Sequence, residues 1–87
     1  MKIHKDFVLR QITNTWVVLP LGKKSVDFTG MLTLNESGAM LWRVLERTGD
    51  PQALVEALTS EYDVSEEQAR MDVDAFLNKL IKAGCIG

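Results

Sequence analysis

The spacing of apolar residues changes a little over a third of the way along the chain, from a strand-like to a helix-like period. In the first part, residues 7–12 and 15–20 are runs rich in β-branched and aromatic side chains, separated by Thr13 and Asn14. Such runs around a two-residue break are typical of a β-hairpin. A third apolar run at residues 30–34 predicts a further short strand. With short links between them, the three runs predict an antiparallel meander.

Beyond the third run, apolar residues recur every three or four positions, which is the period of helices buried on one face. A residue that favours the N-cap precedes each predicted helix. These residues are Asn35, Asp50 and Ser65. The order Ser65-Glu66-Glu67-Gln68 also has the form of a capping box. The helices are predicted at residues 36–48, 51–62 and 66–83.

The last predicted helix has the clearest apolar stripe. Its members are Ala69, Val73, Phe76, Leu77, Leu80 and Ile81. A stripe of this spacing predicts a buried helical face. Three strands followed by three helices predict an α+β fold of the winged-helix type, and 87 residues predict one domain, spanning 1–87, with one core.

The composition is that of an ordinary globular protein, with 46% hydrophobic and 25% charged residues. Charge is unevenly distributed. Residues 1–30 carry five basic against two acidic side chains, whereas the rest carries five basic against ten acidic ones. An acidic helical half repels nucleic acid, so none is expected as a partner. No apolar run approaches the ~18 residues of a membrane span, and a cytoplasmic location is expected.

The chain offers little for catalysis. It has one histidine, one cysteine and no glycine-rich phosphate loop. His4 is expected to be solvated in a frayed terminus, and Cys85 to be a small apolar residue. One cysteine completes neither a disulfide nor a zinc site. Asp72 and Asp74 are two apart and do not face each other on a helix. No catalytic residue, metal or cofactor is therefore predicted.

The predicted third strand is the most suggestive feature for function. Residues 28–35 contain no charged side chain that would discourage another chain from pairing with this strand. A free edge of this kind binds extended peptides by β-strand addition, in which main-chain hydrogen bonds supply affinity. The alternative is an internal strand that the last helix covers.

Residues 30–42, Gly-Met-Leu-Thr-Leu-Asn-Glu-Ser-Gly-Ala-Met-Leu-Trp, resemble the strand and LNxxGxxLW pattern of PqqD-like proteins. The similarity continues through Leu54 to Leu58 and residues 61–64. It then reaches the DVxxFLxxL pattern that begins at Asp72. The ordered combination covers the chain from about Phe7 to Ile86.

This resemblance implies a non-catalytic recognition element for ribosomally made, post-translationally modified peptides. The precursor's leader peptide then adds as a strand beside the third strand, and lies between that strand and the third helix. A separate modifying enzyme, with radical S-adenosylmethionine enzymes as one expected class, performs the chemistry. Pyrroloquinoline quinone synthesis is one pathway that the family serves. The implied peptide-binding residues are Gly30, Met31, Leu32, Thr33 and Leu34 on the strand, and Arg70, Val73, Asp74 and Leu77 on the helix.

Two other functions compete with this interpretation. A winged-helix DNA-binding protein would have a related fold and would read DNA with its third helix. That helix is acidic, whereas a helix that enters a groove of DNA is basic. A structural subunit could instead pair edge to edge with its own copy. We expect a monomer or a weak homodimer.

Overall fold

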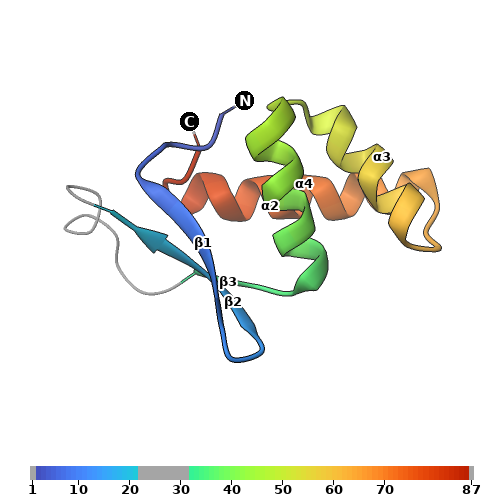
Figure 1. Ribbon diagram of the computed structural model, residues 1–87. Coiled ribbons are helices and arrows are strands. Elements are labelled where there is room, and N and C mark those ends of the chain that lie inside the picture. The colour runs from blue at the N-terminus through green and yellow to red at the C-terminus, as the bar shows by residue number, and fades with distance from the viewer. Residues whose placement is uncertain (1, 22–31, 87) are drawn as a thin grey trace.

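The computed structural model describes residues 2–21 and 32–86 and contains three strands followed by three helices (Figure 1). This confirms the predicted α+β class. Gly30 and Met31, which the sequence assigns to the third strand, lie outside the described residues. The last two helices end one residue before their predicted ends. The elements are β1 (Phe7–Ile12), β2 (Thr15–Pro20), β3 (Leu32–Leu34), α2 (Glu36–Thr48), α3 (Pro51–Glu61) and α4 (Glu66–Lys82).

The strands form an antiparallel sheet in the order β1-β2-β3, so within the described residues β3 pairs on one side only. Thr13 and Asn14 form the two-residue turn between β1 and β2, and Ile12 lies opposite Thr15. On the other side of β2, Trp16 lies opposite Leu34. The sheet therefore has the meander topology that the sequence predicts.

The predicted N-caps all form. Asn35 Oδ1 accepts a hydrogen bond from Gly38 N at 2.8 Å, and Asp50 Oδ1 accepts one from Gln52 N at 3.0 Å. Ser65 Oγ accepts from Gln68 N at 3.1 Å. The Gln68 side chain, however, donates to Asp72 Oδ1 at 2.9 Å. Only the cap half of the predicted capping box is therefore seen.

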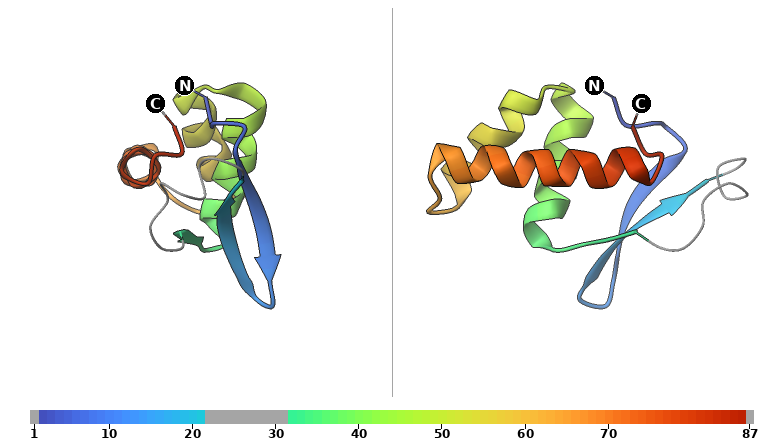
Figure 2. Two further views of the ribbon diagram at one scale, coloured as in Figure 1. Left: turned by 90° about the vertical axis from the view of Figure 1, so that its left-hand side faces the viewer. Right: turned by 180° about the vertical axis from the view of Figure 1, so that it is seen from behind.

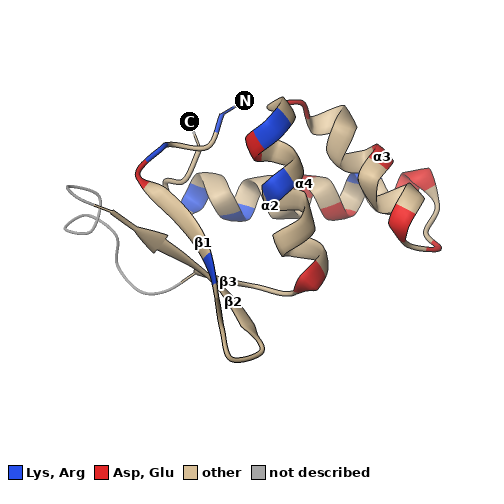
Figure 3. Cartoon of the chain, in the orientation of Figure 1, with Lys and Arg blue, Asp and Glu red and all other residues tan. Residues whose placement is uncertain are grey.

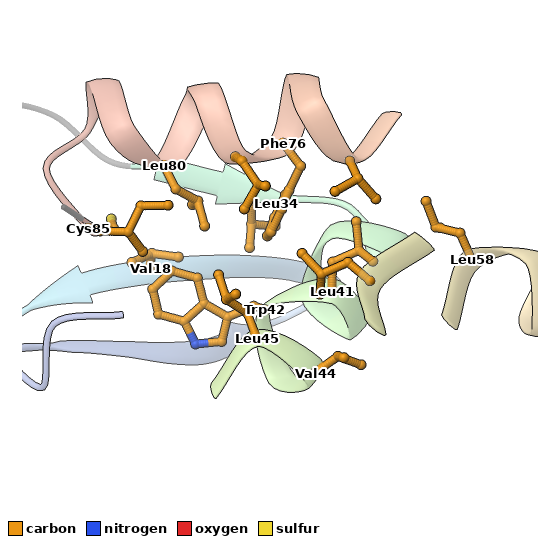
Figure 4. Close-up of a cluster of buried hydrophobic side chains, with 14 of the residues drawn as sticks. Val18, Leu34, Leu41, Trp42, Val44, Leu45, Leu58, Phe76, Leu80 and Cys85 are labelled. Atoms are coloured by element: carbon orange, nitrogen blue, oxygen red, sulfur yellow. The ribbon is translucent and has the colours of Figure 1, made fainter. Parts of the chain in front are cut away.

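The core lies between the sheet and the three helices (Figure 4). Phe76 and Leu80 project from α4 toward Leu34 and Val18 of the sheet, and Trp42 of α2 lies at the centre with no exposed surface. No polar or charged residue is buried among the described residues. The other tryptophan, Trp16, is half-buried, and the Arg43 guanidinium lies 4.7 Å from its ring centre. Apolar burial thus dominates the stability of the fold.

One residue of the predicted α4 stripe was assigned wrongly. Ile81 is 49% exposed, whereas Leu80 beside it is fully buried. Ile81 is the penultimate residue of α4, and two residues later the chain leaves the helix for the turn at Gly84. A helix that ends there leaves Ile81 at the margin of the core.

The N-terminal segment is not frayed, contrary to expectation. Ile3 forms an antiparallel bridge with Ile86, and His4 N donates to Cys85 O at 2.8 Å. The two ends of the chain consequently lie side by side, as Figures 1 and 2 show. The His4 side chain is exposed, as predicted.

Charges separate along the molecule (Figure 3). Acidic residues gather on α3, on the loop after it and on the first turns of α4, whereas Lys79 and Lys82 occupy the last turns of α4. Arg43 and Arg47 lie on α2. Among the described helices, none is long and apolar enough to cross a bilayer.

Candidate functional site

The direction of the backbone groups in β3 follows from the hairpin that precedes it. Ile12 and Thr15 flank a two-residue turn, and such a pair exchanges both of its backbone hydrogen bonds. Hydrogen-bonded and non-hydrogen-bonded pairs alternate along an antiparallel ladder. The backbone groups of Thr15 and Val17 therefore point toward β1, and those of Trp16 and Val18 point toward β3.

The same alternation continues across the next pair of strands. Leu34 lies opposite Trp16 and Leu32 lies opposite Val18, so both leucines direct their backbone groups at β2. Thr33 lies between them, and its N–H and C=O point away from β2. The described part of β3 thus presents one outward donor and one outward acceptor at the margin of the sheet.

A side chain of α4 reaches this margin. Lys79 Nζ donates to the carbonyl oxygen of Thr33 at 2.9 Å, and both residues are exposed. Figure 2 (left) shows α4 end-on. It lies on the side of the β1–β2 hairpin where β3 pairs. The edge is therefore bridged by a flexible, solvated side chain and is not sealed by the helix backbone.

A hollow of about 360 Å³ lies next to this bridge, between the first half of α2, Leu58 of α3 and the middle of α4. Its apolar walls include Leu41, Leu58 and Phe76, and Asp72 and Lys79 supply opposite charges. The remaining lining residues are Asn35, Ser37, Gly38 and Ala75. A hollow of this kind can take one apolar side chain, while its two charged residues can bind polar groups of the same ligand.

The predicted strand residues divide between two environments. Leu32 and Leu34 are 9% and 7% exposed and belong to the core, whereas Thr33 is exposed. Gly30 and Met31 are outside the described residues. Of the predicted strand residues that are described, Thr33 alone offers its side chain and its outward backbone to a partner.

Most of the predicted helix residues lie on the α3 side of α4. Arg70, Val73 and Asp74 line a second, smaller hollow of about 150 Å³. Three residues from the first half of α3 complete its lining: Pro51, Gln52 and Val55. Arg70 Nη2 is 2.7 Å from Glu66 Oε1, an exposed pair within α4. Leu77 is 7% exposed and packs in the core. The structure therefore places Arg70, Val73 and Asp74 at a site different from that of Thr33.

The residues that α4 does bring toward β3 and the start of α2 are ones the sequence analysis did not assign to the site. They are Asp72, Ala75, Phe76 and Lys79. Their spacing of three, one and three is the same as that of Arg70, Val73, Asp74 and Leu77. At 100° per residue the two sets are rotated by about 200° from each other. Val73, Leu77 and Phe76 belong to the buried stripe itself, and the exposed members of the two sets flank it on opposite sides.

Cys85 is the only cysteine of the chain and is fully buried. Desolvation raises the pKa of its thiol from 9.0 to about 11, so the nucleophilic thiolate is scarce at neutral pH. Among the described residues, no three histidine, cysteine or acidic side chains gather where they could hold a metal ion.

The sequence matches the family described as coenzyme PQQ synthesis protein D (PqqD) over residues 15–86. The chain belongs to this family. The match begins at β2 and includes β3 and all three helices, so it contains every described residue of the candidate site. Comparison with curated proteins gives no match.

Two solved structures share the fold of this PqqD-family chain. One is TbiB1 in complex with the TbiA(beta) leader peptide, at 27% sequence identity and a TM-score of 0.79, covering 98% of this chain and 93% of that one. The other is a lasso peptide synthetase B1 complexed with its leader peptide, at 23% identity and a TM-score of 0.74. The alignment with it covers 93% of this chain and 89% of the synthetase chain. Both confirm the three-strand, three-helix architecture.

Proposed function

We propose that this PqqD-family protein binds the leader segment of a ribosomally made precursor peptide by β-strand addition at β3. A separate enzyme then modifies the peptide, and this chain contributes no catalytic group. The observation that carries the proposal is the outward-facing N–H and C=O of Thr33 beside the hollow that Phe76 and Lys79 line. TbiB1, at 27% identity, was solved with a leader peptide, which supports this class of ligand.

The geometry suits an added strand. Neighbouring strands lie roughly 4.8 Å apart, so a peptide beside β3 would exchange two backbone hydrogen bonds with Thr33. Its next residues on either side would turn their side chains to the face on which Leu32 and Leu34 lie. An apolar side chain there would reach the hollow walled by Leu41 and Phe76. Backbone pairing would supply affinity, and the hollow would supply selectivity.

The proposed contact set differs from the one the sequence favours. On the strand it keeps Leu32, Thr33 and Leu34, with Gly30 and Met31 remaining predictions. On the helix it replaces Arg70, Val73, Asp74 and the buried Leu77 by the residues that line the hollow near β3. Those residues are Asp72, Ala75, Phe76 and Lys79.

The identity of the modifying enzyme is a finer part of the proposal. The family's role in coenzyme PQQ synthesis supports a pathway in which a peptide is modified by a separate protein. A radical S-adenosylmethionine enzyme is the class we expect. We propose that the protein works in the cytoplasm as a monomer or weak homodimer.

Substitutions of Thr33 test the docking mode. Thr33→Pro removes the outward N–H without removing a hydrogen bond to β2, a placement that edge strands tolerate. Thr33→Val is the matched control, because it removes the hydroxyl and keeps the N–H. The ligands are synthetic leader peptides encoded by short open reading frames beside the gene, together with the TbiA(beta) leader peptide. Binding is measured by calorimetry, and folding by circular dichroism.

We expect Thr33→Pro to weaken binding at least about tenfold, the effect of losing one or two hydrogen bonds and adding a ring at the edge. Thr33→Val should stay within about twofold of the original protein. The proposal is contradicted if a peptide that binds the original protein binds the folded Thr33→Pro variant equally well.

A further inference from the structure

We propose that Lys79 forms a carboxylate-binding subsite that selects leader peptides with an Asp or Glu beside their apolar anchor. The inference rests on the proposed peptide-binding function and specifies the chemical class of ligand. Its basis is the position of the Lys79 ammonium on the outward carbonyl of Thr33.

Lys79 occupies the place that an added strand needs. Its Nζ is 2.9 Å from Thr33 O, which is the usual distance between a backbone N–H nitrogen and a carbonyl oxygen. A peptide that pairs with Thr33 would put its own N–H at that oxygen. Peptide and ammonium therefore compete for one acceptor, and binding moves the ammonium away from Thr33 or makes it share the oxygen.

A displaced ammonium needs a new partner inside a partly desolvated groove. Within the described chain, the ion pair that forms joins Arg70 to Glu66, and Lys79 is in none. Asp72 is the acidic residue on the same flank of α4, seven positions away, or about 10 Å along the helix axis. It already accepts a hydrogen bond from Gln68. A carboxylate on the peptide is the partner that Lys79 lacks.

The surrounding charges favour such a carboxylate. Lys82, in the last turn of α4, projects on the same side of the helix as Lys79, because three residues turn a helix by about 300°. The acidic residues of α4 lie in its first half (Figure 3). An acid on the peptide would therefore meet positive potential at the Lys79 end of the groove and negative potential at the other end.

The position of the acid in the peptide can be specified. Lys79 and the apolar residues of the hollow line one surface, so both ligand side chains must lie on the same face of the added strand. Side chains on one face of a strand recur at every second residue. The acid and the apolar anchor should therefore be two positions apart. The residue that pairs with Thr33 lies between them.

The test is selection of binders from a displayed library of random twelve-residue peptides. The baits are the original protein, Lys79→Met, Lys79→Glu and, as a matched control, Lys82→Met, which removes one positive charge from the same end of α4 and keeps the Lys79 ammonium that contacts the acid. We expect the original protein and Lys82→Met to enrich an acid two positions from an apolar residue. Lys79→Met should lose the acid, and Lys79→Glu should enrich Lys or Arg in its place.

Affinity of single peptides gives the magnitude. Replacing the selected acid by its amide should weaken binding to the original protein about fivefold, as for a partly exposed ion pair, and should leave binding to Lys79→Met unchanged. The difference should shrink in high salt.

Two results separate this inference from the function on which it rests. Enriched peptides without an acid, or with the same acid in the Lys79→Met pool, overturn the carboxylate subsite. If those peptides lose binding to Thr33→Pro, strand addition stands. A selection that yields no peptide dependent on the N–H of Thr33 overturns both proposals.

Discussion

At the scale of single residues, Thr13 has a backbone conformation that β-branched residues rarely adopt. It is the first residue of the turn between β1 and β2, and its φ is 57°. Two-residue hairpin turns need positive φ here because only such turns match the twist of the strands. The break in the apolar pattern at Thr13 and Asn14 predicted the position of the turn. It did not predict the positive φ of Thr13, because threonine ordinarily has a negative φ.

Replacing Thr13 with glycine should relieve this strain. We expect Thr13→Gly to raise the free energy of unfolding by about 1 kcal/mol. A left-handed conformation costs residues other than glycine roughly 1–2 kcal/mol. Glycine avoids this cost but loses more backbone entropy on folding, which offsets part of the gain. Urea unfolding followed by circular dichroism measures the change. Thr15→Gly is the control: it lies in β2 and should lower stability. A less stable Thr13→Gly variant would disprove the argument.

Cys85 predicts a dependence of stability on alkaline pH. Burial raises the pKa of its thiol from 9.0 to about 11, so the folded protein disfavours the thiolate. The unfolded chain loses this proton at lower pH than the folded one. The contribution to stability is thus complete below pH 9 and is lost as the pH rises toward 11.

The measurement is urea unfolding at pH 7, 9 and 10.5 for the original protein and for Cys85→Ala. Alanine leaves a small cavity and lowers stability at every pH, but it has no thiol to titrate. We expect the difference in stability between the two proteins to narrow between pH 9 and 10.5. A constant difference would show that the buried thiol does not resist ionisation.

At the scale of elements, helix starts were predictable because their causes are local. Asn35, Asp50 and Ser65 each accept a hydrogen bond from a backbone N–H two or three residues later. Such a bond needs only the residue type and the adjacent turn. The buried stripe of α4 followed similarly from its spacing, except at Ile81, where the end of the helix decides burial.

The side of α4 that faces β3 was not predictable in the same way. Arg70 and Asp74 were assigned from the family resemblance. Residues on both flanks of the buried stripe repeat with the same helical spacing, so spacing alone does not separate these two from Asp72 and Lys79. The choice depends on where α3 packs. Its first turns line the flank of Arg70 and Asp74, whereas Leu58 is the one residue of α3 that lines the hollow on the other flank. Packing between distant elements sets this, and no local pattern records it.

Gly38 tests how closely α2 approaches β3. A Cβ built there would lie 3.2 Å from both Asn35 Oδ1 and Leu34 Cβ, so the N-cap and the end of β3 would have to move. Alanine gains about 1 kcal/mol of helix propensity, while a disturbed cap and an overpacked contact each cost about 1 kcal/mol or more.

We expect Gly38→Ala to lower the free energy of unfolding by about 1 kcal/mol and to weaken peptide binding, since Gly38 also lines the hollow. Thermal unfolding and calorimetry with the same leader peptides measure the two effects. Glu46→Ala, at an exposed position of α2 that does not line the hollow, controls for helix propensity without adding a group near Leu34. An increase in stability at Gly38→Ala would mean that the two neighbours move freely.

At the scale of the whole molecule, the joined ends of the chain complete the core. Ile3 bridges Ile86, and both Cys85 and Ile86 are buried at that junction. The sequence predicted a frayed start because residues 1–6 lack a strand-like run, and a single bridge between distant residues leaves no periodic pattern. Deleting residues 1–5 should therefore uncover part of the core.

We expect this deletion to lower the free energy of unfolding by about 2 kcal/mol, near the value for exposing one large aliphatic side chain. Chemical unfolding measures it. A variant in which Lys2 and Lys5 become serine controls for lost charge and should change stability little. If the deleted protein is as stable as the control, the bridge does not contribute to the fold.

The charge distribution of the molecule predicts that duplex DNA is not a ligand, although the fold resembles DNA-binding winged helices. On α4, the helix that would enter the major groove, Glu66, Glu67, Asp72 and Asp74 are all exposed, and Arg70 is paired with Glu66. Phosphates would meet net repulsion along this helix, whereas non-specific binders reach dissociation constants of roughly 10⁻⁴–10⁻⁶ M through basic contacts. We expect no gel shift with a 30-base-pair duplex at about 100 µM protein in low salt.

The control is a variant in which these four acids are changed to amides. It should bind weakly and lose binding as salt rises, which shows that the assay can detect the effect. A salt-dependent shift with the original protein at micromolar concentration would mean that another surface, not α4, binds DNA.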